Sequence, residues 1–305
     1  MIHENIFKAY DIRGIYPTEI NEDASYKIGA VFAQIVKPKK IIVGRDMRIA
    51  SPQLLEYFVC GARHEGVEVE SIGEMSVDAM YYALFRDKKY DAGVYCTASH
   101  NPKDYHGFKM FKRDGTAVRG VDIKKHMEKT EIQVKYQKTA IPEIDIMDDF
   151  IQYLLSFVDI SHIRSLKVVV DAGNGMAGKI IPQLAKHLPI KVIPLFFELN
   201  GNFPNHPSNP LEPLSQTAIT ENVVQHNADF GVIFDGDTDR LFFIDEKGGF
   251  IRADITLLIL TKYVLKKYPG SGVVYNAICS KAVPELVEKW GGRAFRSKVG
   301  FVNIK

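Results

Sequence analysis

The sequence lacks the features of secreted, membrane-spanning and zinc-binding proteins. It has three cysteines among 305 residues, and Cys60, Cys96 and Cys279 lie far apart in largely apolar surroundings. An odd, dispersed set of this kind predicts reduced thiols rather than a disulfide framework or a zinc site. The longest apolar runs fall far short of the roughly 20 residues that cross a bilayer. No basic start precedes an apolar stretch at the N-terminus, so we expect no secretion signal and a cytoplasmic location.

The sequence also has little net charge. Lys and Arg number 39 and Asp and Glu number 37, which gives +2 with His neutral, and the chain has no long run of either sign. This balance argues against nucleic-acid and membrane partners. Apolar residues make up 46% of the chain, enough to bury a core in each of the roughly two domains that this length suggests.

Strand-like and helix-like segments alternate along the chain. Apolar spacing predicts helices at residues 23–36, 52–59, 78–85, 150–158, 177–185, 254–268 and 282–290. Short apolar runs predict strands at residues 40–43, 67–72, 92–96, 167–170, 190–195, 230–234 and 272–275. Pro194 restricts its strand to a sheet edge. The alternation predicts mostly parallel sheets covered by helices, and residues 130–147 read as a linker that contributes an edge hairpin.

The strongest chemical signal is the stretch DGDTDR at residues 235–240, directly after a predicted buried strand. Asp235, Asp237 and Asp239 would repel one another severely without a hard cation among them, so a divalent metal site is predicted. A solvated acidic turn is one alternative. A calcium loop ending at Glu246 is another, but it requires glycine where Arg240 stands.

A second signal is the stretch TASHNP at residues 97–102, again directly after an apolar strand. Small neighbours leave the Ser99 hydroxyl accessible, and His100 and Asn101 can donate hydrogen bonds to an anion. Ser99 is therefore a candidate nucleophile or phosphate carrier. An ordinary hydrogen-bonded turn before a proline is the alternative, and the serine lies outside a Gly-x-Ser-x-Gly elbow.

Basic residues form a third group. Arg13 and Lys109 lie near predicted loop or strand ends, where each is either an ordinary surface charge or part of a site. Arg45, Asp46 and Arg48 are assigned first to a salt-bridged loop.

Together these segments resemble the α-D-phosphohexomutase superfamily, most closely its phosphomannomutase/phosphoglucomutase branch. The match includes AYDIRG at residues 9–14, GRDMR at 44–48, TASHNP at 97–102, GFK at 107–109, DAGNG at 171–175 and DGDTDR at 235–240. It also covers residues 203–214. The resemblance implies successive three-layer α/β/α domains at residues 1–147, 148–250 and 251–305, the third incomplete.

The resemblance also implies a reaction and roles for the candidate residues. The enzyme would interconvert hexose 1-phosphate and hexose 6-phosphate, of mannose or glucose, through a phosphoserine and a hexose 1,6-bisphosphate that also primes it. Ser99 would carry the phosphate and, with the three aspartates, bind Mg²⁺. His100 and Arg240 would steady the phosphate. Lys109, its pKa lowered by Arg13, would take a proton from the sugar hydroxyl, and Arg13, Tyr10, Asn101 and Lys109 would contact the substrate.

Two departures from the family pattern affect these expectations. The family's sugar-reading loop and fourth domain have no counterpart in the chain, and Phe301 stands where the family usually has His. We therefore expect a truncated product that is inactive or impaired unless a separate C-terminal chain completes it. The alternatives are a non-catalytic module that binds sugar phosphate or Mg²⁺, and a metal-dependent phosphatase that leaks phosphate to water.

Overall fold

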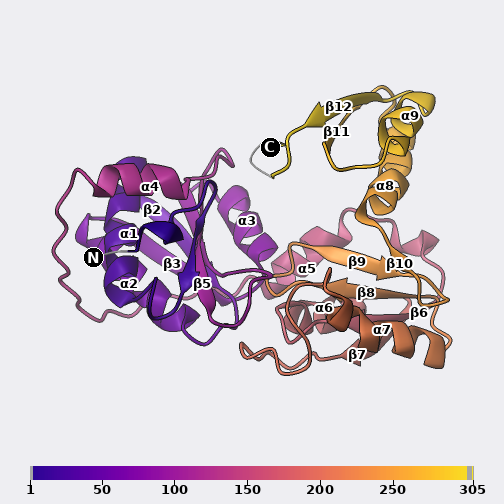
Figure 1. Ribbon diagram of the computed structural model, residues 1–305, viewed down its shortest axis with the longest axis horizontal. Helices are drawn as coiled ribbons and strands as arrows, with labels where there is room; N and C mark the ends of the chain where they lie inside the picture. The colour runs from indigo at the N-terminus through magenta and orange to yellow at the C-terminus, as the bar shows by residue number, and fades with distance from the viewer. Residues whose placement is uncertain (1–2, 301–303, 305) are drawn as a thin grey trace.

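The computed structural model describes residues 3–300 and 304, and it shows three successive units (Figure 1). Phe301 lies outside the described residues. None of the helices described is long and apolar enough to pass through a membrane.

The first unit is a five-stranded sheet with helices on both faces (Figure 1). The strand order is β1-β5-β4-β2-β3, in which β2 pairs in parallel with β3 and β4, whereas β5 is antiparallel to β1 and β4. Its elements are β1 (Ile12–Ile15), α1 (Glu22–Val36), β2 (Lys40–Arg45), α2 (Ser51–His64), β3 (Glu68–Glu74), α3 (Val77–Arg86), β4 (Ala92–Cys96), β5 (Tyr105–Lys112) and α4 (Gly120–Met127).

The two faces of this sheet have different partners. Helices α1 and α2 cover one face, where Phe32, Phe58 and Phe108 form part of one buried cluster. Helix α3 covers the other face in a second cluster, which also contains Phe150 and Ile180 from later in the chain. The second cluster therefore fastens the first two units together.

Residues 130–146 link the two units. They contain no helix or strand, and the expected edge hairpin is absent from this segment. Their one isolated bridge joins Glu143 to Ser71 on β3. Ile132 and Ile141 nevertheless pack against the first core cluster and Ile144 packs against the second, so the segment is held by separate side chains rather than by strand pairing.

The second unit has the same plan, with strand order β10-β9-β8-β6-β7. Strand β6 pairs in parallel with β7 and β8, and β9 is antiparallel to β8 and β10. Strand β7, with Pro194, is at the edge as predicted. The elements of the second unit are α5 (Met147–Leu155), β6 (Leu166–Asp171), α6 (Ala177–Ala185), β7 (Ile190–Leu195), α7 (Pro213–Gln225), β8 (Phe230–Phe234), β9 (Leu241–Ile244) and β10 (Phe250–Ile251).

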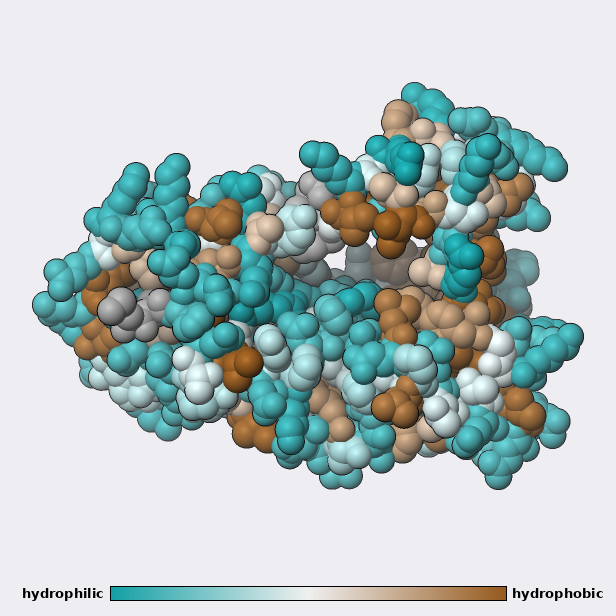
Figure 2. All heavy atoms as spheres, viewed as in Figure 1, coloured by the Kyte–Doolittle hydropathy of each residue, from teal (hydrophilic) through white to brown (hydrophobic). Residues whose placement is uncertain are grey.

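The third unit follows directly after β10. Its described elements are α8 (Ala253–Lys267), β11 (Gly272–Asn276), α9 (Ala282–Lys289) and β12 (Arg293–Ser297), and β11 pairs in parallel with β12. A small buried cluster that includes Leu258, Val283 and Val287 holds the two helices together. Apolar side chains gather on the face of this unit that overhangs the other two (Figure 2).

The arrangement decides where chemistry can occur. In each five-stranded sheet the loops after the central parallel strands project from one edge, which is where α/β proteins place ligands. The loops after β2 and β4 contact the loops after β7 and β8 across the boundary between the first two units. The two mixed sheets confirm the predicted fold class, although parallel and antiparallel pairs are equally frequent in them.

Candidate active site

The serine loop, residues 97–102, follows β4 and is held rigidly. Ser99 is buried and adopts a left-handed backbone conformation with φ 51°. Its amide donates to Thr97 Oγ1 at 2.8 Å, and Thr97 Oγ1 donates to Asp46 Oδ2 at 2.7 Å. A non-glycine residue in this region is uncommon and is kept there only by its surroundings. The loop is therefore built to aim the Ser99 side chain.

Arg48 donates hydrogen bonds to several main-chain carbonyl groups of the same loop and of the residues that follow it. Its guanidinium donates to the carbonyl oxygens of Ser99 at 2.9 Å and Asn101 at 2.5 Å, and also to those of Pro102 and Tyr105. Arg48 is fully buried and its Nε lies 3.3 Å from Asp46 Oδ2. The predicted salt-bridged loop is thus confirmed for this pair, and it supports the serine loop from beneath.

The acid triad, Asp235, Asp237 and Asp239, follows β8. Each residue offers a carboxylate oxygen, and these oxygens lie within 4.8 Å of one another. Two helix N-termini fix the loop, because the amide of Met176 before α6 donates to the Gly236 carbonyl at 3.0 Å and the amide of Val77 in α3 donates to the Asp237 carbonyl at 3.2 Å. The second of these bonds comes from the first unit. Strand β9 occupies the interior of the calcium loop considered above, which excludes that alternative.

The serine loop and the acid triad meet at the boundary between the units. Ser99 Oγ donates to Asp235 Oδ2 at 2.8 Å. Lys109 Nζ donates to Asp237 Oδ2 at 2.7 Å and to Asp239 Oδ2 at 2.6 Å. The structure therefore brings together five residues that the sequence analysis selected from distant segments.

Negative charge dominates this meeting point. Burial and the charges of Asp237 and Asp239 raise the pKa of Asp235 well above its ordinary value. Burial also acts to raise the pKa of Asp237, but the Lys109 ammonium, with smaller effects from Arg13 and Arg240, outweighs burial and holds that pKa below its ordinary value. Two adjacent carboxylates with opposite shifts indicate a site that needs a further cation before all three can be ionised.

The expected lowering of the Lys109 pKa is wrong for this arrangement. Burial does act to lower it, and Arg13 adds a smaller effect in the same direction. The two carboxylates of Asp237 and Asp239 outweigh both and raise the pKa above its ordinary value. Lys109 therefore serves as a charged partner of the triad here and holds its proton.

Arg240, His100 and Arg13 complete the basic side of the site. Arg240 Nη2 contacts Ser99 Oγ and His100 Nδ1, and it lies 3.1 Å from Asp235 Oδ2. Burial and the charges of Arg240 and Arg13 lower the pKa of His100 to about 4. Because an arginine can only donate, His100 Nδ1 is the acceptor and the ring keeps its proton on Nε2. Arg13 pairs with Asp11 at 2.8 Å.

The donor set fits a divalent cation. All three triad ligands are hard carboxylate oxygens, the type that Mg²⁺ and Ca²⁺ bind. Asp237 Oδ1 is buried and has no hydrogen-bond partner among the described residues. Such an orphaned oxygen beside two more carboxylates is costly unless a cation completes its coordination. The acid triad can therefore hold a metal ion.

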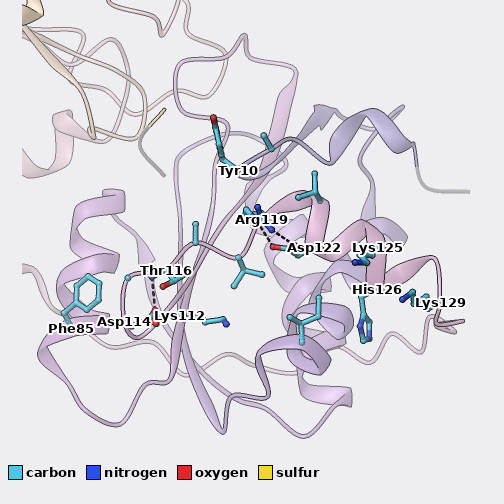
Figure 3. Close-up of a pocket in the computed structure, with 16 residues that line it drawn as sticks. Tyr10, Phe85, Lys112, Asp114, Thr116, Arg119, Asp122, Lys125, His126 and Lys129 are labelled. Atoms are coloured by element: carbon cyan, nitrogen blue, oxygen red, sulfur yellow. Dashed lines mark hydrogen bonds and ion pairs between the residues drawn. The ribbon is translucent and has the colours of Figure 1, made fainter. Parts of the chain in front are cut away.

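Tyr10 belongs to a different feature of the first unit. A hollow of about 1240 Å³ on the first unit is lined by Tyr10, Arg119, Lys125 and other residues, none of which belongs to the acid triad (Figure 3). Asn101, another of the expected substrate contacts, lies in the serine loop and accepts bonds through its main-chain carbonyl. The proposed substrate contacts of both residues stay predictions.

Comparison with known proteins assigns the chain to a family. Residues 4–135 match the phosphoglucomutase/phosphomannomutase alpha/beta/alpha domain I, residues 148–249 match domain II and residues 252–305 match domain III. A phosphohexose mutase of Xanthomonas campestris pv. campestris is 38% identical over 304 residues, covering 98% of this chain and 67% of that protein. The chain belongs to the phosphoglucomutase/phosphomannomutase family.

Other members agree with this assignment. The phosphomannomutase of Escherichia coli K12 is 33% identical over 310 residues, covering 98% of this chain and 68% of that protein. A crystal structure of a phosphoglucomutase/phosphomannomutase family protein from Burkholderia thailandensis has a TM-score of 0.90 and 31% identity, covering 100% of this chain and 68% of that one. The chain thus spans about two thirds of these relatives, and its family is one of intramolecular phosphotransferases. The expected domain boundaries stay predictions.

The site of this phosphoglucomutase/phosphomannomutase family member also contains residues that sequence reasoning missed. Residues 199–208, which we call the clamp loop, reach from the second unit over the serine loop. Its Phe203 ring lies under the Arg48 guanidinium, 5.0 Å from the ring centroid to Cζ. A side chain at Gly201 would place its Cβ 2.7 Å from Arg48 Cα, so the backbones touch there. The family resemblance covered residues 203–214, but it assigned none of them a role in the site.

Proposed function

We propose that the chain transfers a phosphoryl group between the 1 and 6 positions of a hexose phosphate, glucose or mannose, carries it on Ser99 and passes through a hexose 1,6-bisphosphate. The observation that carries this proposal is the 2.8 Å hydrogen bond from Ser99 Oγ to Asp235 in the acid triad. Phosphoryl transfer needs little covalent help from a protein, because positioning and charge neutralisation supply most of the catalysis. A rigidly aimed hydroxyl beside a cation site meets both requirements.

The balance of charge supports Mg²⁺ at the triad with a phosphate on Ser99. Three carboxylates face two permanent cations, Lys109 and Arg240. A divalent ion makes this group net positive, which favours a doubly charged phosphate on the adjacent serine. When bound, Mg²⁺ would neutralise charge that builds on the transferring oxygens.

The basic residues then have distinct roles. Arg240, in contact with both Ser99 Oγ and His100, would orient the phosphate on the serine. His100, neutral and protonated on Nε2, would donate one hydrogen bond without adding charge. Lys109 would attract the phosphate of the substrate, and Arg13 would assist from β1. His100 and Arg240 follow the ends of β4 and β8, whereas Lys109 and Arg13 lie within β5 and β1.

The first half of the cycle tests the proposal directly. Intact and peptide masses are measured before and after incubation with glucose 1,6-bisphosphate and Mg²⁺, and one added phosphate on Ser99 is expected. Absence of phosphate in both samples would contradict the proposal and favour a module that only binds. Steady release of inorganic phosphate from the bisphosphate would instead identify a phosphatase that leaks to water.

Removal of one triad charge should weaken metal binding. We expect Asp237→Asn to lower Mg²⁺ affinity by a factor of about ten to one hundred, because the variant loses a buried carboxylate. Calorimetric titration with Mg²⁺ measures the change. Asp148→Asn, which removes an exposed carboxylate of α5, is the matched control and should bind as the parent does. Equal affinity in both variants would exclude the triad as the metal site.

A further inference from the structure

The clamp loop is positioned to hold the serine loop in place. Ser208 Oγ donates to the carbonyl oxygen of Asn101 at 3.1 Å, and Ser208 is buried. The Phe203 ring packs with Met47 and Met176 in one buried cluster that joins the two units. The Arg48 guanidinium lies between this ring and the carbonyls of the serine loop. Loss of the clamp loop from this place would remove a wall of the site.

One buried pair anchors the clamp loop to the second sheet. His206 Nε2 lies 3.1 Å from Asp171 Oδ1 at the end of β6, and His206 Nδ1 lies 2.8 Å from the Pro207 carbonyl oxygen. His206 is 7% exposed and Asp171 is fully buried. Both ring nitrogens thus face an acceptor. An imidazole satisfies two acceptors only when both nitrogens carry protons, that is, as the cation.

The surroundings of Asp171 favour the same charged state. Its Oδ1 also accepts the amide of Gly173 at 2.8 Å, whereas its buried Oδ2 has no partner among the described residues. A buried carboxylate of this kind is very costly unless a cation pairs with it. Phe196, whose ring lies edge-on to His206 at 5.5 Å, and Gly173 are uncharged neighbours. Asp171 is therefore the group whose charge controls the ring.

The surroundings of His206 shift its pKa in one direction. Burial acts to lower its pKa, but the hydrogen bond and charge of Asp171 and the Pro207 carbonyl outweigh burial and raise it above the ordinary value. A raised pKa means that the anchor is fully formed below about pH 6.5, the unfolded value. It is lost as the pH rises through the higher value of the folded protein.

We propose that the ion pair of His206 and Asp171 positions the clamp loop and, through it, the serine loop, so that loss of the His206 proton loosens both. Neither residue belongs to the acid triad or the serine loop, so the pair acts through other residues and is not catalytic. The anchoring is independent of the reaction. Its effect on phosphate transfer rests on the proposed function.

Hydrogen exchange followed by mass spectrometry tests the anchor without any substrate. His206→Gln keeps a donor near the Nε2 position but removes the charge, and Asp171→Asn keeps an acceptor but removes the opposite charge. At about pH 6, the amides of Ser99 and Asn101 should exchange at least about tenfold faster in each variant, equivalent to about 1.4 kcal/mol. His162→Gln is the matched control, because it removes an exposed histidine 2.9 Å from Asp159. It should leave these amides unchanged.

The pH profile separates positioning from a general loss of stability. In the parent protein, protection of the serine-loop amides, corrected for intrinsic exchange, should be complete below about pH 6.5 and fall as the pH rises above it. In His206→Gln the protection of the serine-loop amides should not change with pH, and the amides of β2 should keep their protection throughout. Unchanged exchange in both variants, or equal loss across the whole first unit, would overturn the proposal.

Phosphate uptake distinguishes failure of the anchor from failure of the proposed function. The rate of Ser99 phosphorylation by glucose 1,6-bisphosphate should fall at least about tenfold in His206→Gln, the factor expected for exchange. If the parent takes no phosphate, the proposed function fails while hydrogen exchange still tests the anchor. If the parent is phosphorylated and neither variant changes uptake or exchange, the anchor alone fails.

Discussion

Replacement of Ser99 by alanine is expected to abolish phosphate uptake from glucose 1,6-bisphosphate. The only atom lost is the Oγ that donates to Asp235 at 2.8 Å and contacts Arg240. Thr97 is an alternative hydroxyl in the same loop, with Oγ1 at 3.2 Å from Asp237 Oδ2. That oxygen is already committed, because it donates to Asp46 and accepts the Ser99 amide. The variant should therefore show no added mass where the parent gains one phosphate.

Two further variants make this result specific. Ser208→Ala removes a buried hydroxyl from the same neighbourhood; the lost bond to Asn101 should at most slow uptake, which should still end at one added phosphate, because the Ser208 oxygen bonds carbonyl groups rather than the acid triad. Ser99→Gly also lacks the hydroxyl but accepts the left-handed backbone without strain, so a fold defect in the alanine variant would not obscure the outcome. Phosphate on either Ser99 variant would place the carrier on another residue.

The sequence predicted the two strand ends well because both strands are fully apolar. The predicted ranges 92–96 and 230–234 coincide with β4 and β8, whose residues are almost all buried. A continuous apolar run that stops at polar residues marks both the strand and its end. Ser99 and the acid triad follow immediately, so their placement at one sheet edge could be deduced. The assignment to the family rests on the same segments.

The charge state of Lys109 could not be predicted in this way. Its partners, Asp237 and Asp239, lie 128 and 130 residues further along the chain. Arg13 was considered as the neighbour that would lower the Lys109 pKa, and it does act in that direction. The sign depends on which charges are closest after folding, and the two carboxylates are in direct contact with the ammonium.

Some elements gave too weak a signal to be found. Helix α7 buries only Ser215, Ile219 and Val223, so its apolar stripe is sparse. Strand β1 is four residues long and acquires its place only by pairing with β5, where Ile12 opposes Phe108. The clamp loop has no periodic pattern at all, and its importance follows from contacts with Arg48 and Asn101 that only the folded chain provides.

The sequence correctly predicted the ion pair of Arg48, but it did not predict that Arg48 also holds the serine loop. The sequence predicted a salt-bridged loop at Arg45, Asp46 and Arg48, and the structure pairs Arg48 with Asp46. Arg45 instead pairs with Glu74 on β3 at 2.6 Å. The two arginines thus lie three positions apart with very different burial, which makes them a natural matched pair for mutation.

Arg48→Met is expected to destabilise the first unit by about 3–5 kcal/mol. The methionine fills similar space but leaves the fully buried Asp46 carboxylate without its counter-ion and the carbonyls of Ser99 and Asn101 without donors. Arg45→Met removes a partly exposed ion pair, so its expected cost is about 1 kcal/mol or less. Hydrogen exchange of the β2 and β4 amides as a function of urea measures the free energy of unfolding of this unit alone.

A double variant locates the source of the loss. If most of the cost in Arg48→Met comes from the uncompensated carboxylate, the additional change Asp46→Asn should restore roughly 1–2 kcal/mol, because the amide needs no counter-ion. The bonds to the serine loop would remain missing, so protection of the Ser99 amide should not recover with it. If the double variant recovers both the free energy of unfolding and the protection of the Ser99 amide, the role of Arg48 is only to neutralise the charge of Asp46. Equal costs for Arg48→Met and Arg45→Met would remove Arg48 as the support of the serine loop.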